Sequence, residues 1–236
     1  MVSQEPADFT KAGARFLSLV LNPFVCGSDG IYRCSGFQTF DWQSHGFGTR
    51  DGSPVADVTL RQVHSATVLN AAGLSDRGAE GDGLITDLPG VAVGIRTADC
   101  VPILMLDSQA RAVAAVHAGW RGTAAGIIEE CVRRMRSEFS TVPENIYAAL
   151  GPSIGACCYQ VGMDVAERFR KWDAVRPGNH VDLGKANRLQ LQAAGVPIEQ
   201  IFDAGLCTFC HPGRFHSFRR DPNDPGRMIS AISRQT

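Results

Sequence analysis

The stretch VAVGIRTADCVPILMLDSQARAVAAVHAGWRG, residues 91–122, decides the fold that the sequence predicts. It holds three apolar runs, over 91–96, 103–107 and 112–117, separated by short segments with turn-forming residues. Short apolar runs bounded in this way are typical of buried β-strands. The stretch therefore predicts three consecutive strands of a sheet, followed by a Gly-rich turn at 118–122.

Three side chains near the ends of predicted strands can bind a metal ion. His64 closes an Arg-Gln-Val-His block, Cys100 lies between the first two apolar runs, and His117 ends the third. Two imidazoles and one thiolate with an open fourth position form the ligand set of a catalytic zinc, because a structural zinc is normally closed by four protein ligands. Their spacing matches no short zinc motif, so the residues alone leave open that they are ordinary core residues.

The same residues fit a further interpretation, in which Cys100 is a catalytic nucleophile. A thiol next to Asp99 that lies near His64 or His117 has the composition of a cysteine hydrolase site. Thiolate nucleophile and thiolate ligand both require a deprotonated sulfur near imidazoles. Residue identity does not separate the two roles.

The remaining pattern predicts strands in the first half of the chain and helices in the second half. Strands are expected over 15–21, 31–35, 45–49, 58–69, 146–150, 201–204, 215–219 and 228–232. Apolar residues at three- and four-residue intervals predict helices over 123–139 with Thr123 as N-cap, over 164–172, and over 183–194 with Asp182 as N-cap. This order indicates an α/β (α+β) protein with mixed sheets covered by helices.

Composition limits the classes of function. The chain has 236 residues, of which 44% are hydrophobic and 20% charged, and is long enough to bury a core. A net charge of -1 indicates no nucleic-acid or membrane partner, so small-molecule partners are expected. The apolar stretch 16–21 is too short to span a bilayer, and Glu5 and Asp8 precede it where a signal peptide carries positive charge. We therefore expect a cytoplasmic protein.

Eight cysteines are expected to be reduced thiols in that compartment. Cys26, Cys34 and Cys131 are predicted to be small buried apolar residues. The segment CTFCH at 207–211 has the pattern of a c-type haem attachment or a redox pair, but haem attachment requires export and the following Pro-Gly predicts a loop. We expect no haem there, and a second metal site that includes the histidine stays open. The pair at 157–158 follows a Gly- and Pro-rich turn and is expected to place one thiol at a pocket.

Arg121 lies between His117 and the predicted helix. A helix N-terminus offers free N–H groups and a positive dipole end, and an arginine adds a bidentate grip, so an anion such as phosphate fits there. The alternative is that the glycines only permit a tight turn and that Arg121 is solvated.

Separated blocks along the chain occur in a characteristic order. They cover residues 61–64, 82–87, 97–107, 116–122, 150–162, 181–191, 217–220 and 226–228. In this order they resemble the laccase-domain family, also called multicopper polyphenol oxidase-like or purine nucleoside phosphorylase proteins. The resemblance covers about residues 44–233, and we expect one domain over 1–236.

This resemblance implies a four-layer α/β/β/α sandwich, related to toxin deamidases with a Cys–His pair. It also implies zinc held by His64, Cys100 and His117, with phosphorolysis of adenosine, inosine and methylthioadenosine and some deamination of adenosine. Copper is the less favoured cofactor, because one Cys and two His cannot build both a blue-copper site and the His-rich cluster that oxygen reduction needs.

The expected roles follow from the resemblance and from the residues together. Phosphate would be held by Arg121 and the helix start with Arg50, Gln62 would contact the substrate, and Asp99 would orient a ligand. The alternatives are a Cys–His amidase or deamidase acting on a peptide or cell-wall fragment with Cys100 as nucleophile, a copper-dependent polyphenol oxidase, and a metal-binding module without turnover.

The chain departs from the family pattern in two places. The segment between residues 50 and 60 lacks the Gly-rich stretch of relatives, which predicts a shortened pocket wall. Ser153 stands where the family has Cys, and Gln160 where it has an acidic residue. Neither departure touches the three expected ligands.

Overall fold

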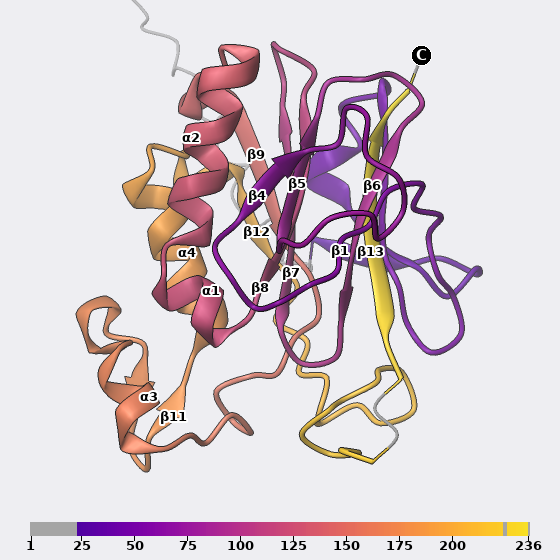
Figure 1. The fold of residues 1–236 in the computed structure, drawn as a ribbon. Coiled ribbons are helices and arrows are strands. Elements are labelled where there is room, and N and C mark those ends of the chain that lie inside the picture. Colours follow the sequence, from indigo (N-terminus) through magenta and orange to yellow (C-terminus); the bar gives the residue numbers. More distant parts are fainter. Residues whose placement is uncertain (1–22, 224–225, 236) are drawn as a thin grey trace, which may run out of the picture.

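The computed structural model describes residues 23–223 and 226–235, and there the chain forms two large sheets and a layer of helices (Figure 1). The five-stranded antiparallel sheet has the order β1 (Phe24–Cys26), β2 (Tyr32–Cys34), β3 (Gln43–Phe47), β13 (Met228–Arg234), β6 (Ala92–Thr97). The six-stranded mixed sheet has the order β12 (Ile201–Asp203), β9 (Ile146–Leu150), β7 (Val101–Asp107), β8 (Val113–Ala118), β5 (Gly83–Thr86), β4 (Val68–Asn70). A short ladder pairs β10 (Val175–Arg176) with β11 (His180–Val181).

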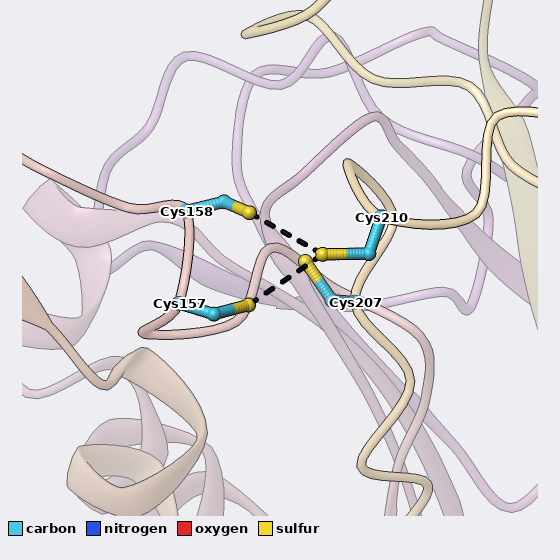
Figure 2. Close-up of side chains that lie close together, drawn as sticks. All are labelled: Cys157, Cys158, Cys207 and Cys210. Atoms are coloured by element: carbon cyan, nitrogen blue, oxygen red, sulfur yellow. Dashed lines mark hydrogen bonds between the residues drawn. The ribbon is translucent and has the colours of Figure 1, made fainter.

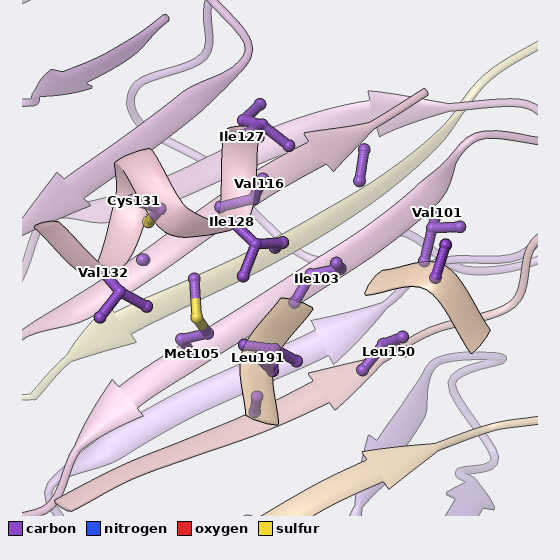
Figure 3. Packing of buried hydrophobic residues seen from close by; sticks show 14 of the residues in the cluster. Val101, Ile103, Met105, Val116, Ile127, Ile128, Cys131, Val132, Leu150 and Leu191 are labelled. Carbon is purple, nitrogen blue, oxygen red and sulfur yellow. The ribbon is translucent and has the colours of Figure 1, made fainter. Parts of the chain in front are cut away.

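The six-stranded sheet is buried on both faces because its central strand β7 is apolar on both faces. All seven residues of β7 are buried. Leu104 and Leu106 face the five-stranded sheet and join a cluster with Phe47 and Ile95. Val101, Ile103 and Met105 face the helices (Figure 3). A strand buried on both sides reads as a continuous apolar run, which is how it stands in the sequence.

The helices cover the outer face of the six-stranded sheet. They are α1 (Trp120–Ala124), α2 (Ile127–Phe139) and α4 (Leu183–Ala193), with α3 (Met163–Glu167) below them in Figure 1. Short 3-10 turns occur at Ser35–Phe37, Pro143–Asn145, Arg170–Trp172 and Ile198–Gln200. The buried residues of α2 are Ile127, Ile128, Cys131, Val132 and Met135, the apolar stripe of an amphipathic helix.

The mixed α/β sandwich expected from the sequence is confirmed. In the described residues, the α-helices that pack on a large sheet all pack on the six-stranded one. The described part of the chain therefore has three layers: the helices, the six-stranded sheet and the five-stranded sheet. No helix in residues 23–223 or 226–235 has the length and apolar character needed to cross a bilayer.

Several expected elements differ in extent. The helix expected over 123–139 is two helices, because Gly126 adopts a left-handed φ of 82° between them. Thr123 is therefore not an N-cap but a buried residue inside α1, and its hydroxyl pairs with the side chain of Asn187. The helix over 164–172 is likewise interrupted after Glu167. Asp182 caps α4 as predicted, by accepting a bond from the backbone of Lys185.

Two expected strands are wrong for a common reason. Residues 58–67 form no ladder beyond isolated bridges, and only Val68–Asn70 of the expected 58–69 strand is regular. Residues 215–219 form turns and irregular backbone. In both segments a buried aspartate binds backbone N–H groups that a strand would use in its ladder. The strand expected over 15–21 lies outside the described residues.

The remaining differences are small. Strands β1, β5, β10 and β11 are too short to stand out as periodic segments and were not expected. Cys34 and Cys131 are buried as predicted, whereas Cys26 is exposed because it ends the edge strand β1.

Candidate metal centre and cavity

His117 is fixed by the pairing of β5 with β8. Gly83 pairs with Val116, so Asp82, just before β5, lies beside His117, and the backbone N–H of His117 donates to the Asp82 carbonyl at 2.7 Å. The Nδ1 atom of His117 lies 2.8 Å from Oδ1 of Asp82. An ionised carboxylate only accepts, so Nδ1 carries the proton and Nε2 is left for another partner.

Asp82 also shapes the turn that presents His64. Its Oδ1 accepts the backbone N–H of His64 at 3.0 Å, and its Oδ2 accepts the N–H and hydroxyl of Ser65 at 2.6 and 2.7 Å. These bonds hold His64 at a left-handed φ of 60°, a conformation that few non-glycine residues adopt. One fully buried carboxylate thus positions both histidines.

Cys100 completes the group from the bend between β6 and β7. The ligand atoms of His64, Cys100 and His117 all lie within 4.8 Å of one another. The two imidazole rings have centroids 4.9 Å apart and meet edge to face. A Cβ at Gly119 would lie 3.0 Å from the Cys100 sulfur and 3.2 Å from Cδ2 of His64, so only glycine leaves this group its space.

The electrostatics favour a deprotonated sulfur. Burial opposes ionisation of Cys100, but hydrogen bonds and charge from His117 and His64 outweigh it and lower the pKa of the thiol to about 6. Burial also opposes protonation of His117, but Asp82 and Cys100 outweigh it and raise the pKa of the imidazole to about 9. The pKa of Asp82 is lowered, because its bonds to His117 and Ser65 outweigh its burial. A thiolate beside two imidazoles is a donor set suited to zinc.

Asp99, which was expected to orient a metal ligand, binds residues of the C-terminal loop in the structure. Its Oδ1 accepts the hydroxyl of Thr208 at 2.6 Å, and its Oδ2 accepts the hydroxyl of Ser217 at 3.0 Å and the N–H of Arg219 at 2.7 Å. Asp99 therefore anchors the C-terminal loop on the bend that carries Cys100. The carboxylate that bonds both histidines is that of Asp82, which the sequence analysis missed. In the sequence, Asp82 is marked only by its position between two glycines at the start of an apolar segment.

The other expected substrate contacts are placed differently. Gln62 borders the cavity, but its side-chain amide exchanges two bonds of 2.8 Å with the backbone of Arg96. Arg50 is not among the residues that line the cavity. Its guanidinium bonds the Phe215 carbonyl and pairs with Asp221 at 3.4 Å, so its expected contact with phosphate has no support in the structure.

A cavity of ≈ 630 Å³ opens over His64, Cys100 and His117. Its other lining side chains are mainly basic or aromatic, and include Arg61, Arg77, Arg96, Arg121, Arg219, Arg227, Trp120, Tyr159 and Phe218. The guanidinium of Arg121 stacks on the Trp120 ring at 4.5 Å from its centroid, and that of Arg219 lies 5.2 Å from the Tyr159 ring. A volume of this size holds a small organic molecule.

The fold and this site define a class, an α/β sandwich protein with a His–Cys–His group at the floor of a basic cavity. A sequence model described as multi-copper polyphenol oxidoreductase laccase matches residues 48–235. The chain belongs to this family, as the order of its sequence blocks predicted.

Relatives carry enzyme names. The chain is 44% identical to a purine nucleoside phosphorylase of Bacteroides thetaiotaomicron over 64% of its own length and 60% of that protein. It is 40% identical to purine nucleoside phosphorylase YlmD of Geobacillus stearothermophilus over 75% of the chain and 72% of the relative. It is 41% identical to adenosine deaminase RL5 of an unknown prokaryote over 75% of each. The crystal structure of YlmD superposes with a TM-score of 0.80 at 32% identity, covering 92% of this chain and 100% of that one.

Proposed function

We propose that the protein is a zinc-dependent purine nucleoside phosphorylase that also deaminates adenosine. The observation that carries the proposal is the convergence of His64, Cys100 and His117 at the floor of a cavity with basic and aromatic walls. Its relatives named purine nucleoside phosphorylase and adenosine deaminase support it. The substrates are then a nucleoside and inorganic phosphate, both small molecules.

Zinc fits this group better than a set of copper ions. In the described part of the chain, no further histidine joins the three ligands, so the His-rich cluster needed for oxygen reduction has no donors. Bound at His64, Cys100 and His117, zinc would supply Lewis-acid chemistry at the cavity floor. Asp82 would keep His117 in the tautomer that leaves Nε2 free for the ion.

The arginines supply a site for the phosphate. Among the described residues, Arg121 and Arg219 pair with no carboxylate, and Nε of Arg96 is buried without a hydrogen-bond partner. Guanidinium groups without a carboxylate partner bind a phosphate dianion through charge-assisted, often bidentate bonds. The Arg121 guanidinium lies over the Trp120 ring, and both side chains line the cavity. Phosphate held there would attack C1′ of the ribose as the bond to the purine breaks.

The aromatic side chains supply a surface for the purine. Trp120, Tyr159 and Phe218 line the same cavity. The Phe218 side chain is exposed although it is apolar, with 53% of its surface accessible. A purine that stacks on it would cover that surface, and such stacking tolerates changes at the ring edge, which agrees with action on several purine nucleosides.

One observation favours a second function, a Cys–His amidase. Asp82, His117 and Cys100 are linked in the order carboxylate, imidazole, thiol that cysteine hydrolases use. In that reaction the thiolate of Cys100 attacks an amide carbon and His117 gives a proton to the leaving amine. Phosphate has no part in it, so phosphate dependence separates the two functions.

The test is an assay on inosine with and without phosphate, using zinc-loaded protein. We expect hypoxanthine and ribose 1-phosphate only when phosphate is present. Arg121→Ala is expected to lower kcat/KM roughly 10- to 150-fold through a higher KM for phosphate, because a hydrogen bond to a charged group is worth about 1.5 to 3 kcal/mol. Its zinc content is expected to stay unchanged.

Arg136→Ala is the matched control, because Arg136 is exposed on α2 and lines no part of the cavity. Unaltered phosphate saturation in Arg121→Ala would remove this residue from the phosphate site. Turnover of an amide without phosphate, and none of inosine with it, would replace the phosphorylase with the amidase.

A further inference from the structure

Four cysteines from two separate turns meet at one end of the six-stranded sheet (Figure 2). Cys157 and Cys158 lie in the turn that follows β9, and Cys207 and Cys210 in the turn that follows β12. Strands β9 and β12 are parallel and end in register, with Leu150 opposite Asp203. Parallel strands that end together start their loops side by side, so the sheet itself brings the two pairs together.

The backbone keeps the two turns in register beyond the strands. The Ser153 N–H donates to the Leu206 carbonyl at 3.1 Å, and the Thr208 N–H donates to the Ser153 carbonyl at 3.0 Å. The Gly155 N–H donates to the sulfur of Cys207 at 3.2 Å. The geometry of the four sulfurs is therefore supported by hydrogen bonds and not by the cysteines alone.

The distances between the sulfurs match one metal ion. The Cys210 sulfur lies 3.7 Å from that of Cys157 and 3.4 Å from that of Cys158, and all four lie within 4.8 Å of one another. A disulfide would bring two of them to about 2.05 Å. Four sulfurs placed tetrahedrally at about 2.3 Å from a zinc ion are separated by about 1.63 times that length, or about 3.8 Å. A cluster of several irons would hold its thiolates further apart.

The type of donor selects among metal ions. Four thiolates bind zinc in preference to magnesium or calcium, which take oxygen ligands.

We propose that Cys157, Cys158, Cys207 and Cys210 hold a second zinc ion, a structural one closed by four thiolates. Loading releases the thiol protons to solvent and ties the turn after β9 to the turn after β12. His211 stays outside this set, because its Nδ1 bonds the Cys207 carbonyl at 2.8 Å and it is not part of the group.

The proposed ion would fix one wall of the cavity. Tyr159 directly follows Cys158 and lines the cavity together with Arg219. Arg219 joins the two segments, because its guanidinium donates to the Gln160 carbonyl at 2.7 Å and lies over the Tyr159 ring. The Thr208 hydroxyl, between the second pair of cysteines, binds Asp99. Losing the ion should loosen this wall while leaving His64 and His117 in place.

The test counts metal in the full chain, purified under reducing conditions with zinc present. We expect two zinc ions per chain in the wild type, one in Cys210→Ser and one in Cys100→Ser. Cys26→Ser is the control, since Cys26 is an exposed thiol outside both groups, and it is expected to keep two. Cobalt substitution distinguishes the sites: the spectrum of a tetrathiolate ion should persist in Cys100→Ser and vanish in Cys210→Ser.

The cobalt spectrum of the wild type needs no variant, so it tests the proposal even if Cys210→Ser does not fold. A wild type that holds one zinc, lost in Cys100→Ser, would overturn the second site. So would an iron–sulfur absorbance, or fewer than eight titratable thiols in the freshly reduced, metal-free protein after unfolding in denaturant. A Cys210→Ser protein with one zinc and a raised KM for nucleoside would support both the site and its effect on the cavity wall.

Discussion

Replacing Asp82 by Asn tests whether one buried carboxylate organises the group of His64, Cys100 and His117. Its Oδ1 accepts bonds from His117 and His64. Its Oδ2 accepts the N–H of Val63 and both the N–H and the hydroxyl of Ser65. In Asp82→Asn the amide would turn its NH2 toward Ser65, because a hydroxyl can accept as well as donate. The carbonyl oxygen then still accepts from the two histidines.

The cost follows from this arrangement. The N–H groups of Val63 and Ser65 then lose their acceptor, which costs about 1.5 to 3 kcal/mol of unfolding free energy for each bond to a charged group. The bonds to His64 and His117 keep a neutral acceptor and lose the charge that raises the basicity of His117. Changes to the hydrogen-bond partner of a metal-binding histidine typically lower metal affinity about 10- to 100-fold. We expect Asp82→Asn to bind zinc at the three-residue site correspondingly more weakly.

The assay is competition for zinc with a chromogenic chelator, paired with urea unfolding of metal-free protein. Asp99→Asn is the matched control, because Asp99 is also buried and accepts three bonds, none from a ligand. It is expected to lose stability with zinc affinity at the three-residue site unchanged. Equal loss of that affinity in both variants, or none in a folded Asp82→Asn protein, would refute the assignment to Asp82.

Two further predictions concern Gly119 and His45. Gly119→Ala is expected to lower zinc occupancy at the three-residue site, because its Cβ would lie 3.0 Å from the Cys100 sulfur. Gly213→Ala is the control, because a Cβ there meets open space, and it should leave the occupancy unchanged. The measurement is the zinc content of the two purified variants. Burial, together with the charge of Arg33, lowers the pKa of His45 from 6.5 to about 4. The contribution of neutral His45 to the free energy of unfolding is therefore complete above pH 6.5 and is lost as the pH falls toward 4. At about 1.36 kcal/mol per pH unit, the loss amounts to roughly 3 kcal/mol. Urea unfolding from pH 8 to 5 should show a smaller decline in His45→Gln, and equal declines would contradict this origin.

The sequence predicted those elements whose residues carry their own signal. The strand at Ile146–Leu150 and the helix after Asp182 were found at nearly the observed bounds, because one is a bounded apolar run and the other has a side-chain cap. The break at Gly126 was missed, because a glycine within a helical pattern of apolar residues does not by itself indicate a left-handed φ.

The groups that depend on distant pairing were predicted only in part. His64, Cys100 and His117 were found by residue type and by the family resemblance. Asp82 was missed because its partner lies 35 residues away across a strand pair. The four cysteines were seen as two separate pairs, since nothing within either pair tells that β9 and β12 end side by side.

The antiparallel pairing of β7 with β8 sets Val101 opposite Ala118 and Pro102 opposite His117. A slip of one residue would turn His117 from the face between the sheets to the face under the helices, since neighbouring side chains alternate. A sheet with a shifted register would therefore present no complete ligand set. Tight zinc binding would then indicate that β7 and β8 have paired in the native register. Zinc supplied during synthesis would stabilise the native alignment over its neighbours, because a ligand shifts the population toward the state that binds it. Zinc binding would then favour the native register of β7 and β8 before the ion takes part in any reaction.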